Sequence, residues 1–129
     1  MSLKSKGISG ERELIHLFWE NGWAAIRVAG SGSMQFPSPD LLVGNRIRKL
    51  AIECKVTKEE KKYFSMDEIK QIKNFSEYFG CEPWIAVKFL RFGWYFINPE
   101  DLKTTDSGYV IGKDDAERKA LRFEELVSI

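Results

Sequence analysis

Two acidic residues and a lysine mark the stretch of this sequence that is best suited to chemistry. Asp40 follows a proline, and Glu53 and Lys55 lie two residues apart in the apolar run Leu50–Val56. Side chains alternate along a strand, so Glu53 and Lys55 project from one face and Cys54 from the other. If this run pairs with the strand that follows Asp40, the Asp40 and Glu53 side chains lie close together. The site then combines two carboxylates with an ammonium group.

This combination suits a divalent cation and a phosphodiester. Adjacent carboxylates repel each other, and a bound cation removes that repulsion. Mg²⁺ binds through one or two carboxylates together with water and substrate phosphate. Lys55 would then orient a water molecule or stabilise charge on the phosphate. A bare Glu-x-Lys on a strand is more often a solvated ion pair, but the neighbouring Leu50–Ile52 indicate a strand inside the sheet, where unpaired charge is costly.

The element that must position these residues is a β-hairpin. Its arms are the aliphatic runs Leu41–Val43 and Leu50–Val56, and Gly44-Asn45 is a turn signal between them. A cationic candidate, Arg27, precedes the hairpin. We expect Trp23–Ala29 to form a strand in which Arg27 is the one cation, and a buried arginine needs an anionic partner. That partner is either structural, such as Glu11, or a substrate phosphate.

A helix is expected from Gly7 to the stop signal Asn21-Gly22, with an apolar stripe at 3.6-residue spacing. Glu11 lies on or beside that stripe, one turn into the helix. A glutamate in the first turn most often stabilises the helix dipole, but the inward position makes Glu11 a site candidate. Arg12 lies at the edge of the stripe.

The segment from Gly30 to Ser38 is expected to be a mobile loop that leads to Asp40. It lacks the Walker pattern and the third glycine of a dinucleotide fingerprint, so no nucleotide cofactor is expected. The hydroxyls of Ser31 and Ser33 are candidates for contacts with the DNA backbone. Met34 and Phe36 either pack on unstacked bases or anchor the loop to the core.

After the hairpin, the charged stretch Thr57–Lys62 is expected to be a loop, either solvated or in contact with phosphates. Ser65 and Glu68 then form a capping box that begins a one-sided helix ending at Gly80. The remaining expected elements are two buried strands, an edge strand and a terminal helix: Pro83–Leu90, Gly93–Ile97, Tyr109–Ile111 and Asp114–Val127. The chain is therefore predicted to be an α/β domain with a central mixed sheet flanked by helices.

The length of 129 residues predicts one domain, residues 1–129, with a flexible N-terminus at residues 1–6 and the weakest pattern at residues 99–129. No apolar run approaches the ~20 residues of a membrane span, so no membrane partner is expected. Two cysteines and a single histidine favour neither a disulfide framework nor a zinc site. These features predict a cytoplasmic protein, and its expected substrate associates it with the nucleoid.

The net charge is +1, but it is distributed unevenly. Residues 1–62 contain eleven Lys and Arg against seven Asp and Glu, a balance of +4, and the remainder has nine against twelve, a balance of −3. The basic excess lies in the half that carries the acidic pair, as expected if cations hold phosphates around a metal site.

With these residues together, the sequence resembles the archaeal Holliday junction resolvases of the Hjc/Hje type, in the restriction-endonuclease-like superfamily. The resemblance runs from about Lys6 to about Ile97. The segments that carry it are Lys6-Gly7, Glu11–Leu14, Arg27–Ser31, Pro39–Gly44, Ile52–Lys58, Val87–Leu90 and Gly93-Trp94.

The resemblance implies a homodimeric, Mg²⁺-dependent endonuclease that binds four-way DNA junctions and nicks two opposing strands. Mn²⁺ is expected to substitute. Asp40 and Glu53 would be metal ligands, and Glu11 would complete the acidic cluster. The other implied catalytic residues are Arg27, Ser31 and Lys55. The expected DNA contacts are Lys4, Lys6, Arg12, Ser31, Ser33, Lys58, Lys61 and Lys62.

Three alternatives remain open from the sequence. One is a restriction-type or nicking endonuclease that acts on linear DNA. Another is a junction-binding module without activity, and the third is a structural domain whose acidic residues form an ion-pair network. For the dimer, we expect the interface to be formed by the second helix together with Val87–Phe96, because this region is rich in aromatic residues.

Overall fold

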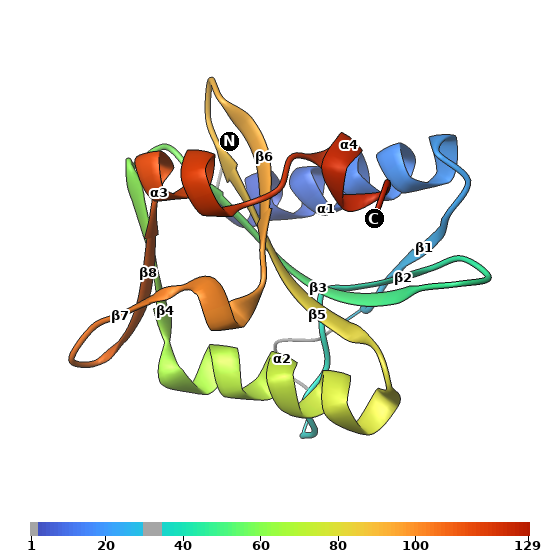
Figure 1. The fold of residues 1–129 in the computed structure, drawn as a ribbon, viewed down its shortest axis with the longest axis horizontal. Helices are drawn as coiled ribbons and strands as arrows, with labels where there is room; N and C mark the ends of the chain where they lie inside the picture. The colour runs from blue at the N-terminus through green and yellow to red at the C-terminus, as the bar shows by residue number, and fades with distance from the viewer. Residues whose placement is uncertain (1–2, 30–34) are drawn as a thin grey trace.

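A five-stranded sheet forms the centre of the molecule (Figure 1). The computed structural model describes residues 3–29 and 35–129, and side chains from residue 8 onward. The strand order is β1-β2-β3-β5-β6, and every neighbouring pair is antiparallel except β3 and β5, which are parallel. The mixed sheet predicted from the sequence is confirmed. The strands are β1 (Ala24–Arg27), β2 (Leu41–Gly44), β3 (Lys49–Thr57), β5 (Glu82–Phe89) and β6 (Gly93–Ile97).

The predicted hairpin is the β2–β3 pair. Leu41 lies opposite Ile52, and Gly44 lies opposite Lys49. The turn forms because the Asn45 side chain accepts hydrogen bonds from the backbone N–H groups of Ile47 and Arg48, at 2.8 and 2.7 Å. The two arms are therefore locked in one register, and this register decides which side chains meet at the other end of the hairpin.

Helices cover both faces of the sheet (Figure 1). α1 (Leu3–Glu20) and α4 (Phe123–Leu126) lie on one face, where the buried ring of Phe18 is 5.0 Å from that of Phe123. α2 (Met66–Phe79) lies on the other face and buries Ile69 and Ile72. No helix within residues 3–29 or 35–129 is both long and apolar enough to cross a membrane.

α2 begins and ends where the sequence predicts. The Ser65 hydroxyl accepts from the Glu68 N–H at 3.1 Å, and the Glu68 carboxylate accepts from the Ser65 N–H at 2.9 Å. At the other end, Gly80 adopts the left-handed conformation with φ of 80°, which closes the helix without a Cβ penalty. α1, by contrast, begins at Leu3, before the predicted start at Gly7. Residues 3–6, which were expected to belong to a flexible N-terminus, are therefore part of the helix.

A second, three-stranded sheet was not predicted in full. Its order is β4-β8-β7, with β4 (Lys61–Ser65), β8 (Gly108–Gly112) and β7 (Lys103–Thr104). The stretch expected to be a charged loop, Thr57–Lys62, is instead the end of β3, a short turn and the start of β4. The edge position predicted for Tyr109–Ile111 is also wrong, because β8 pairs with strands on both sides.

The single terminal helix predicted for Asp114–Val127 is wrong. The structure has two short helices there, α3 (Lys113–Lys119) and α4. They are interrupted because the backbone of Leu121 pairs with Phe96 of β6, through two hydrogen bonds of 2.7 and 2.8 Å. A backbone that bonds to a strand cannot continue a helix at the same residue.

Candidate active site

Asp40 and Glu53 meet where β2 begins. The backbone N–H of Asp40 donates to Glu53 Oε1 at 3.1 Å, and the backbone N–H of Cys54 donates to Asp40 Oδ2 at 2.9 Å. Each carboxylate is therefore held by the backbone of the other strand. The hairpin register explains this arrangement. Leu41 lies opposite Ile52, so Asp40, which precedes Leu41, and Glu53, which follows Ile52, come next to each other.

The environment of Glu53 opposes its ionisation. Burial, and then the nearby charge of Asp40, raise its pKa to about 8, although the Lys55 charge and the hydrogen bond from the Asp40 backbone act in the opposite direction. At neutral pH the protein alone therefore keeps a proton on Glu53 for most of the time. A divalent cation between the carboxylates would supply the missing positive charge and displace that proton.

Lys55 projects from the same strand face as Glu53, towards α2. Its ammonium group donates to Glu68 Oε1 at 3.1 Å. Burial lowers the pKa of Lys55, but the charge of Glu68, its hydrogen bond, and the charges of Glu53 and Asp40 raise it overall, so the lysine stays charged. The Cys54 thiol faces the other side of the sheet, with the residues packed against α1, as strand alternation predicts.

Glu11 and Arg27 form a second pair beside the first. Arg27 Nε lies 3.2 Å from Glu11 Oε1. The Glu11 side chain is 14% exposed and that of Arg27 is 40% exposed. Burial, and then the charge of Asp40, raise the pKa of Glu11, and Arg27 opposes this shift. Glu11 is the structural partner that was one of the two alternatives for Arg27. Because the Arg27 side chain is partly exposed, its guanidinium also remains accessible to a phosphate.

The three candidate metal ligands are not assembled as a closed cage. Among the described residues, no group of three or more His, Cys, Asp or Glu side chains is arranged to hold a metal ion. Asp40 and Glu53 are the two acids that meet directly, while Glu11 is paired with Arg27 and acts on Asp40 through its charge. Two adjacent carboxylates are the kind of ligand through which Mg²⁺ binds, with water and substrate phosphate completing its shell.

The candidate DNA contacts are spread around this centre. Arg12 is exposed on α1, Lys58 and Lys61 are exposed where β3 turns into β4, and Lys62 is half-buried there. The charge of Lys62 contributes to lowering the pKa of Glu68, which is the residue that pairs with Lys55. Four further candidates, Lys4, Lys6, Ser31 and Ser33, have side chains outside the described part of the chain, and so does Met34.

Phe36 is 70% exposed, four residues before Asp40. Its side chain is therefore not packed into the core.

Glu68 is the site residue that sequence reasoning missed. The spacing Ser65-x-x-Glu68 predicts the capping role of Glu68 but does not indicate its contact with Lys55. That contact depends on how α2 crosses the sheet, which the periodicity of neither element specifies.

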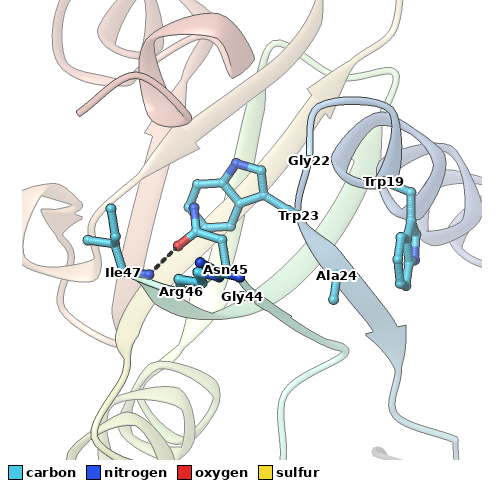
Figure 2. Close-up of a pocket in the computed structure, with 8 residues that line it drawn as sticks. All are labelled: Trp19, Gly22, Trp23, Ala24, Gly44, Asn45, Arg46 and Ile47. Carbon is cyan, nitrogen blue, oxygen red and sulfur yellow. Dashed lines mark hydrogen bonds between the residues drawn. The ribbon is translucent and has the colours of Figure 1, made fainter.

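A hollow on the molecule lies away from these residues (Figure 2). It measures about 820 Å³ and lies between Trp19 of α1, Trp23, and the β2–β3 turn with Arg46 and Ile47. Because Ala24 pairs with Gly44 at this end of β2 and Arg27 pairs with Leu41 at the other, the hollow and the acidic pair lie at opposite ends of the strand. Its lining contains no carboxylate.

The chain is similar to known proteins over nearly its whole length. The family model described as archaeal Holliday junction resolvase (Hjc) matches residues 2–129. A curated protein from Archaeoglobus fulgidus, named crossover junction endodeoxyribonuclease Hjc, is 42% identical over 95% of this chain and 96% of its own. A protein of the same name from Methanocaldococcus jannaschii is 41% identical over 95% of this chain and 86% of its own.

The fold is also similar to a solved structure. The crystal structure of Archaeoglobus fulgidus Hjc, described as a Holliday junction resolvase from an archaeal hyperthermophile, matches with a TM-score of 0.89 at 38% identity. The match covers 95% of this chain and all of that one. The α/β fold with a central mixed sheet is therefore shared over nearly the whole length of both chains.

Proposed function

The chain belongs to the archaeal Holliday junction resolvase family, and on this premise we propose that it is an endonuclease that binds four-way DNA junctions. It hydrolyses one phosphodiester in each of two opposing strands, as a step of recombination and repair in the cytoplasm. The single observation that carries this proposal is the Asp40–Glu53 pair, with Lys55 on the same strand face. The names of the relatives supply the substrate class.

Nucleases of this family generally need a divalent metal ion, and the residues present fit one. Asp40 and Glu53 provide hard oxygen ligands, and the raised pKa of Glu53 indicates a shortage of positive charge between them. We propose Mg²⁺ as the ion, with Mn²⁺ able to replace it, and Glu11 as a further acid that acts on the site directly or through water. When bound, the ion lowers the pKa of water and neutralises charge on the phosphate.

The remaining side chains act on the water and the phosphate. Lys55 keeps its charge and holds an ammonium donor on the Glu53 face of β3, where it orients the attacking water or binds a phosphoryl oxygen. Arg27, held by Glu11 and partly exposed, supplies a second cation to the scissile phosphate. We also propose a role for Ser31 in the loop before Asp40, by resemblance to the family.

Binding of the junction arms is assigned to cations around the site. Arg12, Lys58, Lys61 and Lys62 would contact phosphates, and Lys4, Lys6 and Ser33 would add to them from segments outside the described side chains. Contacts of this kind read backbone position and branch shape rather than base edges. Affinity should therefore fall steeply as salt increases.

A homodimer would place two such sites on a two-fold symmetric junction. Within the region expected from the sequence, Val87, Phe89 and Phe96 are buried in the core, so the proposed interface does not include their side chains. The C-terminal turn of α2 supports an interface better. Phe79 and Tyr78 there are 53% and 93% exposed.

Phe79 also lines an apolar hollow of about 290 Å³ against the edge strand β1. We therefore propose that the α2 end and β1 form the interface.

The experiment that tests the function compares an immobile four-way junction with a linear duplex of the same sequence. Both are incubated with the protein in Mg²⁺ or in EDTA. Paired nicks on opposing strands of the junction, absent in EDTA and on the duplex, are expected. Equal cleavage of the duplex would instead favour a nuclease for linear DNA, and tight junction binding with no cleavage would favour an inactive binding module.

A further inference from the structure

Glu68 connects the lysine of the site to the N-terminus of α2. One carboxylate oxygen, Oε1, accepts from Lys55 Nζ at 3.1 Å, while Oε2 accepts from the Ser65 N–H at 2.9 Å. The backbone N–H of Glu68 is itself bound by the Ser65 hydroxyl at 3.1 Å. One oxygen of the Glu68 carboxylate therefore binds the lysine of the site, and the other caps the start of α2.

The capping box fixes the position of this carboxylate. Glu68 is the third residue of α2, and both its backbone and the far end of its side chain are bound to Ser65. A glutamate on an open helix surface samples several rotamers, but the hydrogen bond from the Ser65 backbone N–H to Oε2 leaves Oε1 facing β3. The acceptor offered to Lys55 is therefore part of the helix start rather than a free surface group.

Lys55 needs such an acceptor. A lysine side chain is a flexible stem with a compact charge, and it takes its direction from its partners. Glu53 lies two residues away on the same strand face and attracts the same ammonium. If Lys55 turned to Glu53, it would occupy a carboxylate that is proposed to bind the metal. Glu68 draws the ammonium to the α2 side instead.

We propose that Glu68 is a positioning residue for strand cleavage, which holds the Lys55 ammonium on the α2 side of the site and keeps it from pairing with Glu53. This inference rests on the proposed nuclease function. It assigns Glu68 no contact with DNA and no ligand role. The residue acts through Lys55, so its effect belongs to the cleavage step and not to junction binding.

Two substitutions separate positioning from helix capping. Glu68→Gln keeps an oxygen that can accept from the Ser65 N–H, since glutamine also completes a capping box, but it loses the charge that holds Lys55. Ser65→Ala removes the hydroxyl cap and leaves both carboxylate oxygens of Glu68 in place. The first change targets the link to the site, and the second targets the helix start alone.

The measurements are the single-turnover cleavage rate of a four-way junction in Mg²⁺, the junction Kd in EDTA, and the Tm. We expect Glu68→Gln to slow cleavage by ~10- to 100-fold, because a misplaced catalytic group costs rate steeply. Its Kd should stay within about twofold, and its Tm should barely change, since ion pairs as exposed as this one add little stability. Ser65→Ala should lower Tm by ~3–6 °C and leave the rate at moderate temperature unchanged.

A double-mutant cycle with Lys55→Ala decides whether Glu68 acts through the lysine. In the Lys55→Ala background, adding Glu68→Gln should change the remaining rate by less than about twofold, because the group it positions is gone. An equal slowing in both backgrounds would overturn the inference, and so would wild-type cleavage by Glu68→Gln. If the wild-type protein cuts no junction, the proposed function fails and this inference fails with it.

Discussion

Asp40, which directly precedes β2, and Glu53 of the antiparallel strand β3 are joined by two hydrogen bonds: the Asp40 backbone N–H donates to Glu53, and the Cys54 N–H donates to Asp40. Because of this reciprocal arrangement, the two carboxylates remain adjacent although their charges repel. Burial of Glu53, together with this repulsion from the charge of Asp40, raises the pKa of Glu53 to about 8. A pair that is unfavourable in the protein alone, and favourable around a cation, is the central feature of the site.

The first prediction concerns the dependence of stability on pH. The folded, metal-free protein favours protonated Glu53, so this residue contributes stability that is complete below its ordinary pKa of 4.5 and is lost as pH rises through about 8. Glu53→Gln carries no such charge. Relative to wild type, the variant should therefore gain ~3–5 kcal/mol of unfolding free energy between pH 4.5 and 9.

Denaturant unfolding of both proteins in EDTA, across that pH range, measures the difference. Asp67→Asn, at an exposed acid of α2 whose carboxylate accepts from Gln71 and not from Lys55, is the matched control and should not reproduce a gain of that size. A difference between Glu53→Gln and wild type that is constant with pH would contradict the raised pKa.

The second prediction is that Mg²⁺ stabilises the protein without DNA. If the cation binds the folded pair as proposed, and not the unfolded chain, then at ten times its Kd it should add ~1.4 kcal/mol and raise Tm by a few degrees. Asp40→Asn and Glu53→Gln should each lose this increase. Thermal unfolding with MgCl₂, compared with NaCl of equal ionic strength, tests it. A shift that persists in both variants would assign the ion to another place.

The third prediction concerns Arg27. Removing it with Arg27→Ala leaves the Glu11 carboxylate without its cation, so the pKa of Glu11 should rise further. Cleavage of a junction should slow by ~10- to 100-fold if the guanidinium also contacts the scissile phosphate. Arg12 is next to Glu11 in the sequence but exposed, so Arg12→Ala should weaken junction binding rather than slow cleavage. It should also reduce the slope of log Kd against log salt concentration by the amount expected for about one phosphate contact. Equal cleavage by Arg27→Ala and wild type, at saturating protein, would refute the role.

The fourth prediction concerns assembly. Phe79→Glu puts a charge into the proposed interface between the α2 end and β1, so the protein should become monomeric. Phe92→Glu is a matched control, because Phe92 is 47% exposed at the β5–β6 turn, within the region first expected from the sequence. Sedimentation velocity of both variants distinguishes them. A monomer with Phe92→Glu and a dimer with Phe79→Glu would place the interface at the β5–β6 turn.

Much of the site could be predicted because strand alternation acts over short distances. The period of two places Glu53 and Lys55 on one face of β3, and the Asn45 turn sets the register that brings Asp40 to them. The position of Glu11 on the inward side of α1 follows from helical spacing in the same way, and its contact with Arg27 was one of two stated alternatives.

The features that could not be predicted depend on contacts between distant segments. The start of β4 falls within the predicted loop Thr57–Lys62 because that stretch is highly charged, three of the five β4 side chains are exposed, and its partner β8 follows much later in the chain. The break between α3 and α4 comes from the pairing of Leu121 with Phe96, which no local pattern in the sequence announces. The contact between Glu68 and Lys55 likewise depends on how α2 packs on the sheet.

The central claim is that Asp40 and Glu53 form the catalytic centre of a junction-resolving nuclease. The most direct measurement is the single-turnover rate of four-way junction cleavage in Mg²⁺ by wild type, Asp40→Asn, Glu53→Gln and the control Asp67→Asn. Rates at least ~10³-fold lower for the two site variants, with junction Kd and the control rate unchanged, are predicted. Cleavage by either site variant within about tenfold of wild type would contradict the claim.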